Sequence, residues 1–201
     1  MTIVRTSHSH PLQIAEVQAG PSWGRIGITF CPGKHDHAAA TGAWARDLGV
    51  DLDAIAAWGA QLVLTLVEPD ELVALRVPRL GLEVQRRGLR WLHLPIADFG
   101  VPAEPFERAW VAQGAEIRAL LRAGGDVLVH CKGGLGRAGM VAARLLVELG
   151  WAPDEAIRAV RRVRRGAIET PGQLALVRRT LPCIFKTRTG SGSPSGLWVE
   201  V

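Results

Sequence analysis

The sequence predicts an α/β fold, in which a mostly parallel twisted sheet is covered by helices on both faces. Apolar runs such as 61–67 and 126–131 are typical of strands buried in a parallel sheet. Segments of helical periodicity alternate with these runs, as expected for parallel strands joined by helices. The stretch 12–30 differs, because two strand-like runs flank a Gly-Pro turn and predict an amino-terminal antiparallel hairpin.

The remaining elements follow in order along the chain. Residues 31–42 are rich in turn formers and predict a loop. A helix is expected over 51–59, with Asp51 or Asp53 near its start, and Gly59 is expected to end it. The other expected elements are strands over 61–67, 90–95 and 126–131 and helices over 69–75, 80–88, 106–125, 137–150, 153–165 and 171–181.

Length and composition predict one globular domain. With 201 residues, of which 48% are hydrophobic, the chain can bury a substantial core. We expect this domain to cover 1–186 and a Gly/Ser-rich tail to cover 187–201. The amino terminus lacks the apolar core of a signal peptide, and the most apolar stretch, 54–67, is too short to cross a bilayer. A cytoplasmic protein without a membrane partner is therefore expected.

Cysteine and histidine usage argues against structural cross-links and metal. Cys31, Cys131 and Cys183 are an odd number without metal-site spacing, which favours a reducing compartment. The histidine-rich segments 8–10 and 35–37 lack Cys or Glu at supporting positions and are interpreted as solvated loops. We therefore expect no metal and no other cofactor.

The positive charge of the chain indicates an anionic partner. The formal net charge is +5 and comes mainly from arginine. The arginine-rich run 160–166 contains no aromatic residue, so nucleic acid is not the expected partner. This run is either a solvated helix end or a surface that steers a charged substrate.

The stretch VHCKGGLGRAG, residues 129–139, links a predicted strand to a predicted helix. The glycines between Cys131 and Arg137 lack a β-carbon, so successive backbone N–H groups can point inward and form a nest for an anion. Arg137 adds a planar fork for two phosphate oxygens, and the same positive environment favours the nucleophilic thiolate of Cys131. The sequence thus predicts a phosphate held over a nucleophilic sulfur. The expected phosphate-binding positions are Lys132, Gly133, Gly134, Leu135, Gly136 and Arg137.

The segment HCKGGLGR, residues 130–137, resembles the His-Cys-x5-Arg signature of cysteine-dependent protein phosphatases. More broadly, the chain is similar to the cyclin-dependent kinase-associated phosphatase family, whose members are dual-specificity enzymes. The matching stretches are FCPGK (30–34), LRVPRL (75–80), HLPIADFGVP (93–102), HCKGGLGRAGMVAARLLVELG (130–150) and RGAIETPGQ (165–173).

The resemblance implies a role for individual residues. Cys131 would attack phosphorus and form a phosphocysteine, while Arg137 would bind the equatorial oxygens. Asp98 would protonate the leaving oxygen and then activate water. His130 would orient the loop and support the thiolate, and Gln173 would position the attacking water. The implied partner is a phosphorylated protein substrate.

Several features of the sequence bear on the turnover and the substrate of such an enzyme. Ala138 stands where the family usually carries a Ser or Thr hydroxyl that assists phosphocysteine breakdown, so a phosphate-binding pseudophosphatase with little turnover is an alternative. Tyrosine is absent, which favours a shallow site for phosphoserine, phosphothreonine and phosphotyrosine over a deep tyrosine-specific pocket. Lys132 resembles the loop lysine of phosphoinositide phosphatases, and RNA 5′-phosphatases share the loop signature. Phosphoinositides and RNA 5′-phosphates therefore stay open as alternative substrates. The sequence predicts no oligomeric state.

Overall fold

The computed structural model describes residues 4–39 and 42–183. Its centre is a five-stranded sheet in the order β1-β2-β7-β5-β6. β1 pairs antiparallel with β2, and the other neighbouring strands are parallel, which confirms the predicted α/β class and the amino-terminal hairpin. The strands of this sheet are β1 (Ala15–Gln18), β2 (Arg25–Phe30), β5 (Ala60–Thr65), β6 (Arg90–His93) and β7 (Asp126–Cys131).

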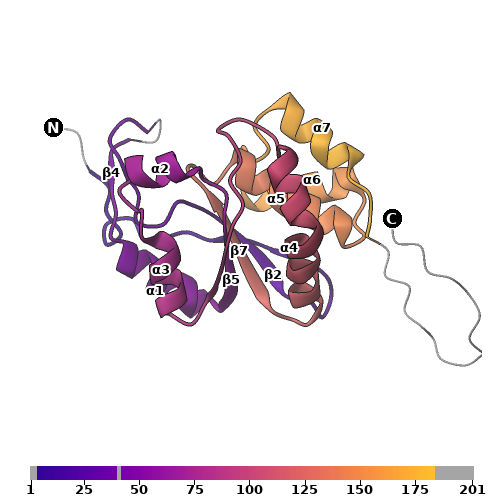
Figure 1. The fold of residues 1–201 in the computed structure, drawn as a ribbon, viewed down its shortest axis with the longest axis horizontal. Helices are drawn as coiled ribbons and strands as arrows, with labels where there is room; N and C mark the ends of the chain where they lie inside the picture. Colours follow the sequence, from indigo (N-terminus) through magenta and orange to yellow (C-terminus); the bar gives the residue numbers. More distant parts are fainter. Residues whose placement is uncertain (1–3, 40–41, 184–201) are drawn as a thin grey trace, which may run out of the picture.

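Helices cover both faces of the sheet. α1, α2 and α3 lie on one side and α4, α5, α6 and α7 on the other (Figure 1). None of the helices in the described part of the chain is long and apolar enough to cross a membrane. The helices are α1 (Leu48–Trp58), α2 (Pro69–Ala74), α3 (Leu80–Arg86), α4 (Glu104–Arg122), α5 (Gly136–Glu148), α6 (Pro153–Val163) and α7 (Pro171–Arg179).

The central strands are apolar throughout because each of their faces packs against a separate core. In β5, Leu62 and Leu64 point into the core beneath α4 to α7, whereas Val63 points into the core beneath α1 to α3. All three side chains are fully buried. This two-sided burial explains why the sequence shows continuous apolar runs here and not an alternating pattern.

The start of α1 differs from the prediction. The helix begins at Leu48, and Asp47 caps it by accepting a hydrogen bond from the Val50 N–H at 2.9 Å. Asp51 does not cap the helix. It is buried, and its carboxylate forms an ion pair with Arg46 at 2.7 Å. The predicted end is confirmed, since Gly59 adopts the left-handed conformation with φ of 100°.

The segment 31–42, predicted as a loop, contains a short strand. β3 (His35–Asp36) pairs antiparallel with β4 (Trp44–Ala45) in a separate two-stranded sheet. Strands of two residues are too short to show an alternating pattern, so no sequence signal predicts them. The predicted tail, 187–201, lies outside the described residues.

Candidate active site

The loop between β7 and α5 wraps around the sulfur of Cys131. Cys131 is the last residue of β7 and is 3% exposed. The backbone N–H of Gly134 donates to its Sγ at 3.2 Å. Gly134 needs to be glycine, because its φ is +68° and a β-carbon there would lie 2.5 Å from the backbone nitrogen of Phe30.

The other two loop glycines, Gly133 and Gly136, differ in what a side chain at each position would meet. A β-carbon on Gly136 would lie 2.5 Å from Oε2 of Glu169, which is the end of a flexible and exposed side chain that can move aside, and 3.0 Å from the Gln173 amide. At Gly133 a β-carbon would meet nothing within 4 Å. Of the three loop glycines, Gly134 is therefore the one that the backbone itself requires.

Arg137 is buried at the first turn of α5, and three oxygen-bearing groups surround its guanidinium. It donates to both carboxylate oxygens of Glu71 at 2.5 and 2.9 Å and to the Ile96 carbonyl at 2.9 Å. It also lies 2.9 Å from Oδ1 of Asp98. Burial lowers the pKa of Arg137, but the hydrogen bonds that it donates to Glu71 and the nearby Cys131 outweigh this effect, so the net shift of the pKa is upward.

Sequence reasoning missed Glu71. Its position in the first turn of α2 suggests only a favourable interaction with the helix dipole. The signal that could have found it lies in the sheet order, because the segments that follow β5 and β7 meet at the same sheet edge. Burial raises the pKa of Glu71, but hydrogen bonds from Arg137 and from the Glu68 backbone lower it below its ordinary value.

Asp98 lies at the exposed entrance of the site, on the loop between β6 and α4. Its side chain is 47% exposed and its Oδ1 accepts the Phe99 N–H at 3.1 Å. Phe99 has a positive φ of 56°, and the Gly100 N–H closes the turn onto the Ala97 carbonyl at 2.9 Å. The structure therefore brings Asp98 to Arg137, and the sulfur lies deeper in the loop.

Gln173 is buried beside the phosphate loop and binds backbone groups with both ends of its amide. Oε1 accepts the Thr170 N–H at 3.3 Å as part of the capping box of α7 and also accepts the Glu169 N–H at 2.9 Å. Nε2 donates to the Gly100 carbonyl at 3.1 Å. A β-carbon on Gly136 would lie 3.0 Å from the same amide. Gln173 thus connects α7 to the loop that carries Asp98.

His130 is fully buried behind the loop. Its Nε2 lies 2.8 Å from Oγ1 of Thr65, and the same hydroxyl oxygen accepts the indole N–H of Trp91 at 2.9 Å. The Thr65 hydroxyl has one proton to donate and two lone pairs, so its contact with Nε2 fits either neutral tautomer of His130. Burial, the main cause, lowers the pKa of His130 to about 3, so the imidazole is neutral at pH 7.

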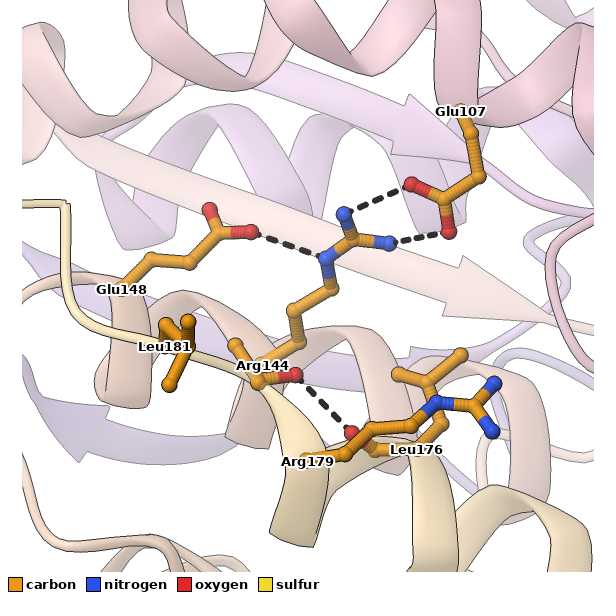
Figure 2. A pocket seen from close by; sticks show the side chains of 7 residues that line it. Glu107, Arg144, Glu148, Leu176, Arg179 and Leu181 are labelled. Carbon is orange, nitrogen blue, oxygen red and sulfur yellow. Dashed lines mark hydrogen bonds and ion pairs between the residues drawn. The ribbon is translucent and has the colours of Figure 1, made fainter. Parts of the chain in front are cut away.

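A surface pocket lies elsewhere and contains none of the predicted site residues. This cavity of about 420 Å³ is lined by residues of α4, α5 and α7 and of the segment after α7. Figure 2 shows the Arg144 guanidinium between Glu107, which it binds at 2.7 and 2.8 Å, and Glu148, at 2.8 Å. These charges already bind one another, which indicates a structural network. No group of three or more His, Cys, Asp or Glu within 4–39 and 42–183 is placed to hold a metal ion.

The Cys131 thiol lies at the carboxyl end of a parallel strand, accepts the N–H of Gly134 from the following loop and lies near the Arg137 guanidinium. This arrangement is typical of the cysteine-based phosphatase folds. A family model described as Tc-R-P, polymorphic toxin system DSP-PTPase phosphatase, matches residues 45–151, and the chain belongs to this family. The matched segment includes both Asp98 and the phosphate loop.

Individual relatives agree with the family. Rat cyclin-dependent kinase inhibitor 3 is 36% identical over 128 residues, covering 62% of this chain and 59% of the relative. Human phosphatidylglycerophosphatase and protein-tyrosine phosphatase 1 is 36% identical over 113 residues, covering 55% of each chain. The chain thus spans less than two thirds of the length of these curated relatives.

Solved structures show the same fold. Kinase-associated phosphatase, carrying a serine in place of its catalytic-site cysteine, superposes with a TM-score of 0.72 at 28% identity, covering 83% of this chain and 92% of that one. The active form of Tk-PTP superposes with a TM-score of 0.60 at 30% identity, covering 83% and 95%. The resemblance to the kinase-associated phosphatase family is confirmed.

Proposed function

We propose that this chain is a phosphatase that hydrolyses phosphate monoesters through a phosphocysteine intermediate. The observation that carries the proposal is the 3.2 Å contact between the Gly134 N–H and Sγ of Cys131, next to the Arg137 guanidinium. Inward N–H groups and a guanidinium fork are the donors that a phosphate bound over the sulfur requires. The family match and the similarity to a phosphatase with a catalytic-site cysteine support it.

In the first chemical step, the Cys131 thiolate attacks phosphorus, and a sulfur–phosphorus bond forms as the ester P–O bond breaks. The loop N–H groups and Arg137 stabilise the negative charge on the equatorial oxygens. Asp98, in its protonated form, gives its proton to the leaving oxygen, so the product departs as an alcohol. Its position at the exposed entrance suits this role, because the leaving group departs on that side.

In the second step, water attacks the phosphocysteine and the electron pair of the S–P bond returns to the sulfur. The Asp98 carboxylate takes the proton of the water, and inorganic phosphate leaves. His130 acts as a neutral group that fixes the backbone of the loop. Gln173 positions the water only after its amide leaves the Gly100 carbonyl. Ala138 supplies no hydroxyl to the departing sulfur, so this step is the slower one.

We place the enzyme in the reducing cytoplasm and assign it a phosphorylated protein as substrate. The mechanism needs Cys131 as a free thiol, which a reducing compartment preserves. The exposed entrance at Asp98 and Phe99 suits a phosphorylated side chain on a protein surface. The expected phosphoresidues are phosphoserine, phosphothreonine and phosphotyrosine, on a single catalytic domain that covers 1–186.

The test is hydrolysis of p-nitrophenyl phosphate by the chain and by Cys131→Ser. We expect the Cys131→Ser variant to lose all measurable turnover and still bind vanadate, because the loop N–H groups and Arg137 are retained. Cys183→Ser is the matched control and should keep wild-type turnover. Equal turnover in the chain and in Cys131→Ser would end the proposal.

Two other functions each have an observation in their favour. Ala138 favours a phosphate-binding protein with little turnover, which would bind vanadate tightly without steady-state hydrolysis. Similarity to a phosphatidylglycerophosphatase favours a lipid phosphate as substrate. Phosphate release from phosphopeptides, a phosphoinositide, phosphatidylglycerophosphate and a 5′-phosphorylated RNA, compared at equal concentration, distinguishes these functions.

A further inference from the structure

Lys34 is a buried lysine that the proposed mechanism does not use. It is 4% exposed and has no ion pair with a carboxylate of the residues that the structure describes. Its ammonium group donates to the Lys132 carbonyl at 3.3 Å and lies 5.2 and 5.4 Å from the ring centres of Phe30 and Trp44. Buried lysines without a paired carboxylate are rare, so this placement calls for a functional reason.

The backbone around Lys34 is fixed. The Gly33 N–H donates to the buried Asp51 carboxylate at 2.8 Å, and Asp51 is held by Arg46. Gly33 has a φ of +70° and packs directly on Leu48. The buried ion pair therefore positions the turn that carries Lys34.

A second cation binds the same loop from the other side. Arg164, at the carboxyl end of α6, donates through Nε to the Gly134 carbonyl at 2.9 Å and through Nη2 to the Gly133 carbonyl at 3.1 Å. Arg164 belongs to the arginine-rich run 160–166, which the sequence left open as a solvated helix end or a surface that steers a charged substrate. Together with Lys34, it binds the carbonyls of three consecutive loop residues.

These contacts determine where the loop N–H groups point. In a planar trans peptide, the carbonyl of one residue and the N–H of the next point in opposite directions. The Gly133 carbonyl turns outward to Arg164, and the following N–H, of Gly134, turns inward to the Cys131 sulfur at 3.2 Å. By the same geometry, the N–H groups of Gly133 and Leu135 point away from the carbonyls that bind Lys34 and Arg164. The Lys132 carbonyl also accepts the Cys31 N–H at 3.3 Å.

The two cations also supply positive charge that the described carboxylates do not balance through an ion pair. Arg137, by contrast, is paired with both Glu71 and Asp98. Burial lowers the pKa of Lys34, and the nearby Asp36, Cys31 and Cys131 oppose this effect while Lys132 adds to it. Burial also lowers the pKa of Arg164, with Cys131 opposing. A thiolate or a phosphate in the loop is the anion that stabilises both cations.

We propose that Lys34 and Arg164 are positioning residues that bind the outer carbonyls of the phosphate loop, direct its N–H groups inward and favour the anionic sulfur of Cys131. The inference deepens the proposed function and rests on it. It adds that much of the attraction for phosphate comes from groups that never contact the substrate.

The test uses charge-removing and charge-retaining variants of the full chain: Lys34→Met, Lys34→Arg, Arg164→Met and Arg164→Lys. Alkylation of Cys131 by iodoacetamide at pH 6 is followed by peptide mass, and vanadate affinity is measured by calorimetry. Each methionine variant should slow alkylation and weaken vanadate binding about tenfold, the effect expected from one lost charge nearby. Lys34→Arg and Arg164→Lys, which keep the charge, should retain most of the wild-type alkylation rate and vanadate affinity. Arg158→Met, which alters an exposed arginine earlier on α6, should behave as wild type.

Wild-type alkylation and vanadate affinity in both Lys34→Met and Arg164→Met would overturn the inference. If burial makes Lys34→Met unfold, Arg164→Met still decides, because Arg164 is only half-buried. The proposed function fails separately, when the wild-type chain itself binds no vanadate and its Cys131 reacts no faster than Cys183.

Discussion

Arg137 is bound by Glu71 on one side and approached by Asp98 on the other. The contact with Glu71 is a two-point interaction at 2.5 and 2.9 Å, on a carboxylate whose side chain is only 18% exposed. The contact with Asp98 is a single 2.9 Å approach from a side chain that is 47% exposed. We therefore expect an arriving phosphate to displace Asp98 from Arg137 and Glu71 to keep the guanidinium in its plane.

Glu71→Gln tests the orienting contact. The substitution keeps the shape of the side chain but removes one of the two charge-assisted hydrogen bonds to Arg137. We expect kcat/KM for p-nitrophenyl phosphate to fall about 10- to 100-fold, because the guanidinium fork loses its fixed plane. Asp70→Asn, an exposed neighbour in the same first turn of α2, is the control. An equal loss in Asp70→Asn would assign the effect to the helix terminus and not to Arg137.

Asp98→Asn tests the group at the entrance. The asparagine side chain cannot protonate the leaving oxygen, so kcat should fall by about 10²- to 10⁴-fold. The loss should be larger for alkyl phosphates, whose leaving groups need protonation most. The basic limb of the pH profile of kcat/KM should disappear. Vanadate should bind at least as tightly as to wild type, since a carboxylate that competes for Arg137 is gone. An unchanged basic limb would remove Asp98 from this role.

The fold was largely predictable because its signals are local. Two-sided burial makes the parallel strands continuously apolar, and Gly59 marks a helix end through its left-handed backbone. The start of α1 was not predictable, because Asp47 and Asp51 are both acidic and only tertiary structure pairs one of them with Arg46. The sequence pattern therefore could not show that Asp47 caps the helix and that Asp51 forms the buried ion pair.

In the candidate site, too, the residues of one local segment were predictable from the sequence, whereas those brought together by tertiary structure were not. Cys131 and Arg137 belong to one short loop, so their chemistry and spacing appear directly in the sequence. Glu71, Lys34 and Arg164 come from three separate segments that only the sheet order and the packing of α6 bring to that loop. Their contacts are with a guanidinium and with backbone carbonyls, which leave no pattern in the residue types around them.

His130 should make the folded state sensitive to acid. Its folded pKa, about 3, lies below the unfolded value of 6.5, so the unfolded chain takes up a proton first as the pH falls. The stabilisation is complete above pH 6.5 and is lost progressively between pH 6.5 and 3, by about 2 kcal/mol at pH 5. Urea unfolding at pH 7 and pH 5 should show this loss in the wild type and not in His130→Gln. His37→Gln, at an exposed turn, should retain the wild-type difference, and the same difference in His130→Gln would contradict the assignment.

The loop glycines offer a matched pair for stability. Gly134→Ala places a β-carbon 2.5 Å from backbone atoms at a φ of +68°, and both terms oppose folding of the loop. We expect a loss of about 2–4 kcal/mol in the free energy of unfolding. Gly133→Ala meets open space and should change that free energy by less than about 1 kcal/mol. Equal losses for both variants by urea unfolding would show that the backbone conformation of residue 134 is not the limiting factor.

Ala138→Ser tests whether the second chemical step limits the enzyme. Ala138 lies in the first turn of α5, directly after Arg137, and is fully buried, so a serine hydroxyl there would be kept out of solvent. A hydrogen bond to the departing sulfur contributes about 1.5–3 kcal/mol, which corresponds to an acceleration of about 10- to 150-fold in phosphocysteine hydrolysis. Rapid mixing with p-nitrophenyl phosphate should give a burst of p-nitrophenolate equal to the enzyme concentration in the wild type. In Ala138→Ser the steady-state rate should rise and the burst should shrink.

Ala142→Ser adds a hydroxyl one turn further along α5, at another fully buried alanine, and controls for a buried serine as such. It should leave both the burst and the steady-state rate unchanged. A wild type without a burst, together with an Ala138→Ser variant of unchanged rate, would show that phosphoenzyme formation is the slow step. The missing hydroxyl would then have no kinetic consequence, because the step it assists would already be faster than the attack by Cys131.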